Sequence, residues 1–439
     1  MTIDLSCPAS NRRTFLSTGA GIAVSAGLVG SGALSGCASA ARTDREGELD
    51  ELFADLADCR GDVAPIDSSE YESRRQRLGR LLAEQDRDAL ILEPCATMTY
   101  LSGVSWGRSE RLFGLIVLAD GSHFWVAPAF EEERARRRIV RSTGNDPSIV
   151  TWDEHEYAYA PLASELGRRR ATRLCMEPSI RYAHVAALAA AMGQDPAASA
   201  RALVTELRGR KDEHELALLR RANEATQEAI LAASHHIRPG MVGTDISELI
   251  HHAQTKMGLR NIWDLSLVGP AAALPHGSTE RIELQRGEVI LIDTGGALHG
   301  YQSDNTRSWV FDGTPSEHQA GVWHAVHAAQ RAAFDSMAPG VVTGDVDRAA
   351  RGFLEAGGWT RGYSTFSHRL GHGIGLEGHE DPYFDGGSEV VLKSGMTLSN
   401  EPGIYLLGEF GIRIEDIIAI TEDGAEHFGS WQKAPTSPA

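Results

Sequence analysis

The sequence contains few cysteines and few positive charges. Five Cys among 439 residues are too few to hold a domain of this size together with disulfides. Lys and Arg number 42 against 60 Asp and Glu, so the formal net charge is −18. A surface this acidic repels phosphate backbones, which excludes nucleic acid as an expected partner. With 42% hydrophobic and 23% charged residues, the composition is that of a globular protein and excludes a wholly disordered chain.

Long apolar runs and several common catalytic motifs are also missing. No apolar run in the body of the chain approaches the roughly 20 residues of a membrane-spanning helix. There is no HExxH or Walker lysine motif, so zincin and P-loop sites have no support. Residues 373–378 match the dinucleotide pattern GxGxxG in letters, but Pro382 follows too soon for the helix that this pattern must open. A nucleotide site is therefore not expected.

The first 40 residues have the features of an export signal. Arg12-Arg13 precede a short stretch rich in Gly and Ala, which ends in Leu34-Ser35-Gly36-Cys37. These motifs resemble a twin-arginine signal followed by a bacterial lipobox. We therefore expect a signal peptide over 1–36, lipidation of Cys37, a tether over 37–66, and an exported, periplasmic protein that contacts the membrane only through its lipid anchor. An accidental arginine pair in a disordered N-terminus is the alternative.

From residue 67 onward, short apolar runs alternate with amphipathic segments, which predicts a mixed α/β (α+β) fold. In a first domain, 67–205, residues 89–92 predict a strand, and the runs flanking Asp120-Gly121 predict a hairpin. A second domain, 206–430, opens with a helix to about 237 and another capped by Thr244. The Pro- and Ser-containing end, 431–439, is expected to be disordered. The remaining expected elements are strands at 288–293, 306–311 and 412–420 and helices at 315–338 and 343–357.

Two aspartates of the second domain indicate a cation site. Asp293 ends the apolar run 289–292, where a charge is costly unless it has a partner. Asp304 follows eleven residues later. If the intervening chain forms a hairpin that turns near Leu298, the two carboxylates face each other, and facing carboxylates repel unless cations lie between them.

Further potential ligands follow toward the C-terminus. Residues 368–379 interleave three histidines with four glycines, Glu401 comes at a strand end, and Arg413 and Glu415 share one face of an alternating strand. A set of one His and four carboxylates is rich in oxygen, which suits a pair of Mn, Co, Fe or Zn ions. Two such ions can hold a bridging hydroxide and polarise a carbonyl group.

These motifs together resemble the prolidase, aminopeptidase P and creatinase family. The resemblance covers about 67–430 and implies a creatinase/prolidase-like N-terminal domain followed by a catalytic domain with the pita-bread fold. Pro275-His276-Gly277 resembles the family's upstream histidine segment. The other matching motifs are Ile292-Asp293-Thr294-Gly295, Ser303-Asp304, His368 to His379, Asn400-Glu401-Pro402-Gly403 and Ile412-Arg413-Ile414-Glu415-Asp416.

The resemblance implies a role for each matching residue. Asp304 and Glu415 would bridge two divalent metal ions, for which manganese is expected ahead of Co, Fe or Zn. Glu401 would also carry a proton from the attacking water to the leaving nitrogen. His276 and His379 would contact substrate and stabilise the oxyanion, His368 would line the substrate pocket, and Arg413 would orient the ligand carboxylates. The complete ligand set is Asp293, Asp304, His372, Glu401 and Glu415, and its presence argues against the creatinase branch.

The resemblance implies a binuclear metallopeptidase that hydrolyses Xaa-Pro bonds or small dipeptides. Two alternatives stay open, because a fold does not determine a substrate. The first is a metal-dependent lyase or amide hydrolase that acts on a non-peptide. The second is a binding lipoprotein without turnover, against which the presence of His276 and His379 counts. The expected partner is a peptide or small-molecule substrate. Because dimers are common in the family, the resemblance also implies a second copy of the chain as a partner.

Overall fold

The computed structural model describes residues 45–193, 197–278 and 280–439. Residues Leu49–Ala439 form one compact unit. The predicted signal peptide, with its Arg12-Arg13 pair, and the predicted lipidation site Cys37 lie outside the described residues.

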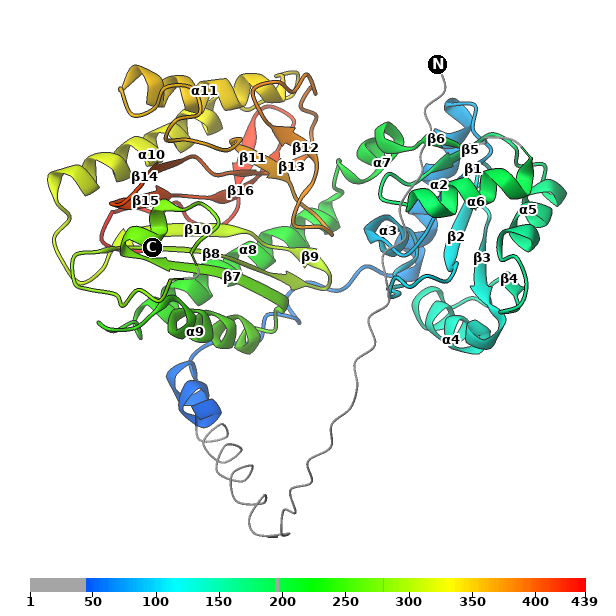
Figure 1. The fold of residues 1–439 in the computed structure, drawn as a ribbon, viewed down its shortest axis with the longest axis horizontal. Coiled ribbons are helices and arrows are strands. Elements are labelled where there is room, and N and C mark those ends of the chain that lie inside the picture. Colours follow the sequence, from blue (N-terminus) through cyan, green and yellow to red (C-terminus); the bar gives the residue numbers. More distant parts are fainter. Residues whose placement is uncertain (1–44, 194–196, 279) are drawn as a thin grey trace, which may run out of the picture. The chain divides into compact units, whose positions relative to one another are not determined.

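The first half of this unit is a six-stranded mixed sheet with helices around it (Figure 1). Its strand order is β4-β3-β2-β1-β5-β6, in which β1, β2 and β3 pair antiparallel and the other neighbours pair parallel. The predicted strand and the predicted Asp-Gly hairpin are both present. The elements are α2 Ser68–Glu84, β1 Ala89–Leu92, α3 Ala96–Ser102, β2 Gly114–Leu118, β3 His123–Pro128, η1 Ala129–Glu131, α4 Glu132–Thr143, β4 Ile149–Trp152, α5 Tyr159–Arg168, β5 Leu174–Met176, α6 Tyr182–Met192, β6 Ala197–Ser199 and α7 Arg201–Arg208.

The second half contains three sheets and two pairs of helices. The first sheet has the strand order β10-β8-β7, with β9 paired to β8. The second has the order β12-β11-β13-β16-β17, and the third consists of β14 and β15. The elements are α8 Glu213–Ser234, α9 Gly243–Lys256, β7 Arg260–Val268, η2 Gly269–Ala273, β8 Val289–Leu298, β9 Tyr301–Gln302, β10 Asn305–Val310, α10 Glu317–Asp335, α11 Thr343–Ala356, β11 Gly371–Gly373, β12 Glu380–Phe384, β13 Thr397–Asn400, β14 Gly403–Leu406, β15 Phe410–Arg413, β16 Asp416–Ile420 and β17 Ala425–His427.

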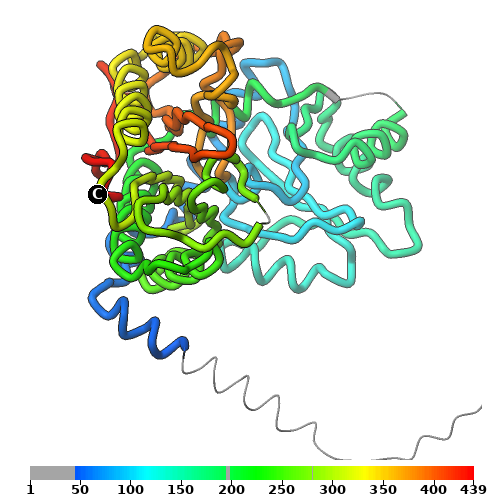
Figure 2. Tube along the Cα trace, turned by 60° about the vertical axis from the view of Figure 1, so that its left-hand side comes forward, coloured from blue at the N-terminus to red at the C-terminus, as the bar shows by residue number. Residues whose placement is uncertain are grey.

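The two helix pairs cover opposite faces of these strands. Figure 1 shows α10 and α11 on one side and α8 and α9 on the other, and the tube in Figure 2 shows the same order of layers. One apolar core lies between α8, α9 and the β7–β8 strands, and a second lies between α10, α11 and the strands from β13 to β16. The strands between the two cores carry the polar residues of the candidate site.

Local sequence explains where the long helices begin. Asp212 accepts the backbone N–H of Glu215, whose side chain accepts the N–H of Asp212, so α8 starts with a complete capping box. Helix α10 begins in the same way, with Ser316 and Gln319. The prediction that Thr244 caps α9 is wrong, because the helix already includes Gly243 and its cap is Val242, whose N–H donates to the Asp245 side chain.

Three segment boundaries differ from the sequence predictions. Residues from 49 onward in the predicted tether pack into the core of the second half, where Phe53 and Cys59 are fully buried. Helix α7 runs to Arg208, beyond the predicted boundary at 205, because Leu207 completes the core of the first half. The C-terminal end is not disordered, since buried Gln432 donates to the carbonyls of Ser308 and Ser437.

The strand predicted over 412–420 is interrupted at residues 414–415. Before the break, β15 pairs with β14, and after it, β16 pairs with β13. At the break, the Glu415 N–H donates to the Thr306 carbonyl on β10. One segment therefore joins three sheets, and Glu415 lies at the point where they meet.

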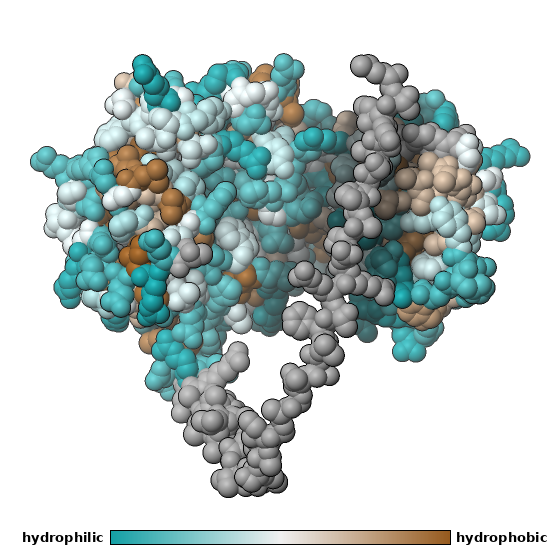
Figure 3. Space-filling model, viewed as in Figure 1, coloured by the Kyte–Doolittle hydropathy of each residue, from teal (hydrophilic) through white to brown (hydrophobic). Residues whose placement is uncertain are grey.

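The surface agrees with the composition. Figure 3 shows that hydrophilic residues cover most of the face in view and that hydrophobic residues form small, separate patches on it. Among the described residues, we find no helix that combines the length and the apolar composition needed to cross a bilayer. This agrees with the lack of long apolar runs in the body of the sequence.

A buried ion pair joins β10 to β16 beside the break. Arg307 donates to the Asp416 carboxylate at 2.6 Å, and both side chains are almost completely excluded from solvent. Asp416 also accepts from Gln330 and Gln227. Since Arg307 and Asp416 are both buried and paired with each other, removing the charge of Asp416 leaves the Arg307 cation without compensation.

We therefore expect Asp416→Asn to destabilise the protein by about 3–5 kcal/mol. Urea denaturation in the presence of a chelator measures this, so that altered metal binding does not contribute. The matched control is Arg137→Met, which removes an exposed pair with Glu133 and should change the free energy of unfolding by less than about 0.5 kcal/mol. Equal effects of the two substitutions would contradict the importance given to the buried pair.

Candidate metal centre

The predicted site residues converge on one cavity of about 430 Å³ in the second half. Its walls come from β7, β8, the residue just before β10, β11 with the loops before and after it, and the segments around 275, 401 and 413–415. All of the residues to which the sequence assigned a metal, catalytic or substrate role line this cavity: His276, Asp293, Asp304, His368, His372, His379, Glu401, Arg413 and Glu415. The lining also includes four residues to which the sequence analysis assigned no role: Trp263, Leu265, Pro275 and Arg369.

The two aspartates are neighbours on one hairpin, although not in the way the sequence suggested. The hairpin turns at residues 299–300, but Asp293 stands opposite Thr306, and Asp304 is its diagonal neighbour on the same face. Asp293 also lies within β8 rather than at its end. Helix α8 positions Asp304, because buried Asn223 accepts the Asp304 N–H at 3.1 Å.

Asp293, Asp304 and Glu415 form the first group of potential ligands. One oxygen from each lies within 4.8 Å of the other two. Oδ1 of Asp293 and Oδ1 of Asp304 are buried and have no hydrogen-bond partner among the described residues. Buried carboxylate oxygens without a donor are costly, and a shared cation would satisfy them.

His372, Glu401 and Glu415 form a second group with the same spacing. Nε2 of His372 lies 3.4 Å from Glu401, 3.6 Å from Asp304 and 3.9 Å from Glu415. Glu415 belongs to both groups. Asp304 belongs to the first group, with Asp293 and Glu415, and also lies close to His372 of the second group. These are the positions expected of residues that bridge two ions.

The orientation of His372 indicates a ligand rather than an ion-pair partner. Its Nδ1 lies 3.1 Å from the Gly373 carbonyl, to which it can only donate, so Nε2 carries a lone pair. Burial lowers the pKa of His372 to about 3, and the ring is neutral at ordinary pH. A lone pair that faces three carboxylates is unfavourable unless a cation lies between them.

The carboxylates themselves are held in an unfavourable environment. Burial, followed by the neighbouring carboxylates, raises the pKa of Asp304 and that of Glu415 well above the usual range. Burial likewise raises the pKa of Glu401 to about 7. These directions describe a site with too much negative charge for its burial, and bound divalent cations would reverse them.

Arg413 is a cation that the chain itself supplies to the ligands. Its guanidinium donates to Asp293 and to the Thr306 hydroxyl, and that hydroxyl donates to Glu415 at 2.6 Å. Ser399 similarly donates to Glu401 at 3.1 Å. Thr306 and Ser399 were not recognised from the sequence, because single hydroxyl residues within strands carry no distinctive pattern.

Tyr405 is a further residue that sequence reasoning missed. Arg413 donates to its hydroxyl at 2.9 Å, and that hydroxyl lies 2.8 Å from Nε2 of His368. Since Nδ1 of His368 donates to the Arg369 carbonyl, Nε2 accepts from Tyr405. A Cβ atom at position 403 would lie 2.6 Å from the Tyr405 hydroxyl, so this arrangement requires the glycine of the Asn-Glu-Pro-Gly motif. That glycine was the one feature of the sequence that could have pointed to a side chain packed closely against this turn.

His379 and His276 stand at the mouth of the cavity, where both are exposed. The His379 ring stacks on His372 with centroids 3.6 Å apart, and one of its nitrogens lies within 4.8 Å of ligand atoms of Asp304 and His372. Burial, then the charge of Arg369, lowers the pKa of His379, which favours the neutral ring.

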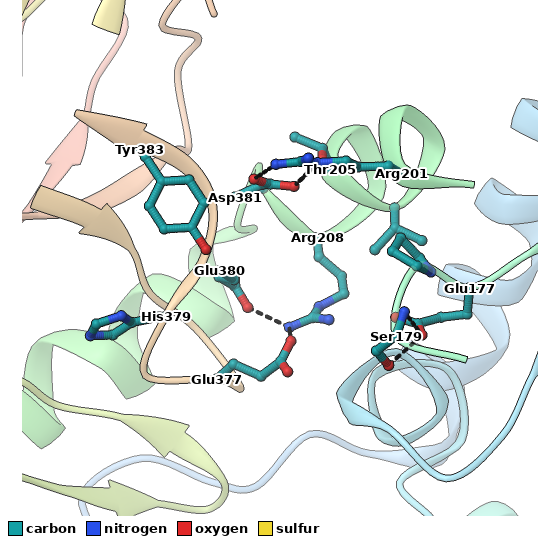
Figure 4. Close-up of a pocket in the computed structure, with 13 residues that line it drawn as sticks. Glu177, Ser179, Arg201, Thr205, Arg208, Glu377, His379, Glu380, Asp381 and Tyr383 are labelled. Atoms are coloured by element: carbon teal, nitrogen blue, oxygen red, sulfur yellow. Dashed lines mark hydrogen bonds and ion pairs between the residues drawn. The ribbon is translucent and has the colours of Figure 1, made fainter. Parts of the chain in front are cut away.

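A buried charge cluster holds the loop that carries His379. Glu380 receives Lys211 at 2.7 Å and also pairs with Arg208, which reaches Glu377 at 2.7 Å. Figure 4 shows Arg208 extending from α7 to both glutamates, while His379 points away on the other side of the loop. The first half of the unit therefore contributes to the site by positioning this loop.

The donor set fits a pair of divalent cations. It combines four carboxylates with one neutral imidazole, and its ligand atoms form two overlapping groups. The glycine-rich stretch 371–378 belongs to this site and not to a nucleotide, because β11 is followed by a loop and β12 instead of a helix.

Two family profiles match the chain. The creatinase/prolidase N-terminal domain matches residues 74–209, and metallopeptidase family M24 matches residues 217–422. The Xaa-Pro dipeptidase of Lactobacillus delbrueckii subsp. lactis is 30% identical over 364 residues, which cover 81% of this chain and 96% of that protein.

Solved structures agree with these matches. Dipeptidase PepE from Mycobacterium ulcerans is 31% identical and superposes with a TM-score of 0.78. The match covers 85% of this chain and 100% of the PepE chain. The prolidase of Thermococcus sibiricus is 26% identical, with a TM-score of 0.74 and coverage of 84% and 99%. The arrangement of helix pairs around the strands is thus the pita-bread fold that the sequence motifs implied. The chain belongs to metallopeptidase family M24, with a creatinase/prolidase N-terminal domain ahead of the peptidase domain.

Proposed function

We propose that this protein is a binuclear metal-dependent peptidase that hydrolyses Xaa-Pro bonds or small dipeptides. The observation that carries the proposal is the neutral His372, whose Nε2 faces three carboxylates at 3.4–3.9 Å. The family membership supports peptide hydrolysis, and relatives described as a dipeptidase and an Xaa-Pro dipeptidase support short substrates. Manganese is the expected metal, with Co, Fe and Zn as alternatives.

The proposed ligands are Asp293, Asp304, His372, Glu401 and Glu415. Two divalent ions bound there would act as Lewis acids and lower the pKa of a bound water. Glu401, which accepts a hydrogen bond from Ser399, would take a proton from the attacking water and return it to the leaving nitrogen. His379 and His276, which line the cavity, would donate to the oxygen of the scissile carbonyl. Arg413 holds Asp293 and, through Thr306, Glu415 in orientation.

Metal content provides the first test of the proposal. The purified protein should bind about two divalent ions per chain. Asp304→Asn and Glu415→Gln should each reduce the occupancy of both ions, because these residues border both groups of ligands, whereas Asp293→Asn should weaken mainly one. Elemental analysis together with metal titration measures the occupancy.

The control for metal content is Asp153→Asn. Asp153 belongs to an exposed cluster with His155 and Glu156 outside the cavity, and its substitution should leave both ions in place. An active protein that contains no transition metal would rule out the proposed mechanism.

The histidines separate catalysis from simple binding. His372→Ala should lose metal. His276→Ala and His379→Ala should keep metal and lose about a hundred- to a thousandfold in kcat, since an oxyanion donor acts only where charge develops. Turnover of Xaa-Pro dipeptides and of other dipeptides, with metal content measured in parallel, provides the comparison.

Two outcomes would revise this assignment. Loss of metal in His379→Ala would make His379 a metal ligand instead of an oxyanion donor. A ligand role is compatible with the structure, because a ring nitrogen of His379 lies within 4.8 Å of ligand atoms of Asp304 and His372. Metal binding without hydrolysis of any peptide would favour the lyase or amide-hydrolase alternative, and metal binding without any turnover would favour a binding protein.

We also propose that the protein is exported and anchored by a lipid on Cys37. The support is the order of the sequence motifs, Arg12-Arg13, a short apolar stretch and Cys37. A lipid on Cys37 would hold the protein at a periplasmic membrane face without a transmembrane helix. Assembly as a homodimer likewise stays a prediction from the family resemblance.

Replacing Arg12 and Arg13 by Lys should block export, and Cys37→Ala should release a soluble form of the protein. The distribution between membrane, periplasmic and cytoplasmic fractions, followed by immunoblotting in the native host, measures both effects. Membrane-bound Cys37→Ala protein, indistinguishable from the parent, would contradict lipid anchoring.

A further inference from the structure

Glu401 and Glu415 stand just beyond the end of one strand ladder. Strands β13 and β16 pair antiparallel, and their last opposed residues are Asn400 and Asp416. The next residue outward on each strand is a metal-ligand candidate, and the backbone N–H groups of both candidates donate to other segments instead of to each other. The ladder that carries the two carboxylates therefore does not by itself set the distance between them.

Gln330 of α10 joins the two strands at this last pair. Its side-chain nitrogen donates to the Asn400 carbonyl at 3.2 Å and to the Asp416 carboxylate at 3.0 Å. In return, the Asn400 side chain donates to the Gln330 backbone carbonyl at 2.9 Å. All three residues are completely buried, so water does not compete for these hydrogen bonds. One amide group thus ties both strand ends to the helix.

The alternation of side chains along the strands carries this constraint to the metal centre. Neighbouring residues of a strand point to opposite faces of the sheet. Asn400 and Asp416 face α10, where Gln330 meets them. The next residues, Glu401 and Glu415, face the cavity. Gln330 therefore holds the backbone directly beside both ligand candidates, from the face opposite the metal centre.

The two carboxylates differ in what else holds them. Glu415 accepts from the Thr306 hydroxyl at 2.6 Å and donates its N–H to the Thr306 carbonyl, so β10 holds it independently of β13. Glu401 accepts from Ser399, which lies on β13 itself. The Ser399 hydroxyl also accepts the His372 N–H at 2.9 Å. A shift of β13 would therefore disturb Glu401 and His372 together and leave Glu415 on β10.

We propose that Gln330 is a positioning residue for the metal centre. It sets the place of Glu401 relative to Glu415, and thereby the affinity for the ion at the second group of ligands, which is His372, Glu401 and Glu415. This inference rests on the proposed binuclear centre. Groups that hold metal ligands in orientation typically contribute about ten- to a hundredfold to metal affinity. Loss of the Gln330 amide should therefore weaken one ion and spare the ion at Asp293 and Asp304.

A purely structural role for Gln330 leads to a different expectation. A substitution that only loosened the core would lower the free energy of unfolding and would weaken both ions alike. Gln432 provides the matched comparison, because it is also completely buried and its amide also donates twice, to the carbonyls of Ser308 and Ser437. Neither of these two partners adjoins a ligand candidate in the sequence.

The experiment titrates Mn²⁺ into chelator-stripped protein, by calorimetry, and compares Gln330→Met with Gln432→Met. The parent should bind two ions. Gln330→Met should bind one ion at close to the parental affinity and the other about ten- to a hundredfold more weakly. Gln432→Met should keep both affinities within about threefold, although urea denaturation should show that it is destabilised too. Gln330→Asn, whose amide is too short to reach both strands, should repeat the selective loss and serves if the Met variant does not fold.

Electron paramagnetic resonance gives a readout that does not depend on activity. At a Mn²⁺ concentration that fills both sites of the parent, the parent should show two coupled ions. Gln330→Met should show an isolated ion under the same conditions, and Gln432→Met should resemble the parent.

A second comparison tests whether Gln330 acts through Glu401. In a Glu401→Gln background, Gln330→Met should lower the affinity for the second ion by less than about threefold more, because residues that act on one another are not additive. Equal weakening of both ions, or a full further loss in that background, would overturn the proposal and leave Gln330 a structural residue. A parent that binds two ions and a Gln330→Met variant that keeps both at parental affinity would overturn the positioning role alone. A parent that binds no divalent ion would overturn the proposed function and this inference together.

Discussion

The second half of this protein is organised around one electrostatic constraint: four carboxylates are packed about one neutral imidazole inside the fold. Asp304 and Glu415 are almost completely buried, and His372 turns a lone pair toward them. Such an arrangement is unstable by itself, because burial and mutual repulsion both oppose ionised carboxylates. Arg413, which donates to Asp293, compensates only part of this charge. Bound divalent cations would relieve this repulsion, and the chemistry proposed for the site depends on them.

The fold meets this constraint by bringing different sheets to one point. The β8–β10 hairpin supplies Asp293 and Asp304, β11 supplies His372, and the break between β15 and β16 supplies Glu415. Hydroxyl groups of the same strands and the buried pair between Arg307 and Asp416 then fix the orientation of the acidic side chains. The first half contributes from outside, since Arg208 on α7 holds the loop of His379 (Figure 4). Catalytic geometry and packing are thus provided by the same strands.

Much of this could be read from the sequence because the ligands stand in short, local patterns. The metal-ligand candidates follow apolar runs or interleave with glycines, and such patterns survive without knowledge of the tertiary contacts. The errors have a common cause. The tether beyond residue 49 and the end around Gln432 were assigned by their polarity, but their few apolar or amide groups find buried partners elsewhere in the chain. Local composition cannot report such distant partners.

The sequence by itself determined the fold class, the family motifs and the identity of the five ligand candidates, since these depend on residue type and spacing along the chain. The tertiary structure decided which of these residues share a cavity and how they are oriented. It showed that Asp293 and Asp304 are diagonal neighbours, that Tyr405 joins Arg413 to His368, and that Gln330 joins the strand ends beside Glu401 and Glu415. These properties depend on distances between segments far apart in sequence, and only the packing of helices and sheets sets those distances.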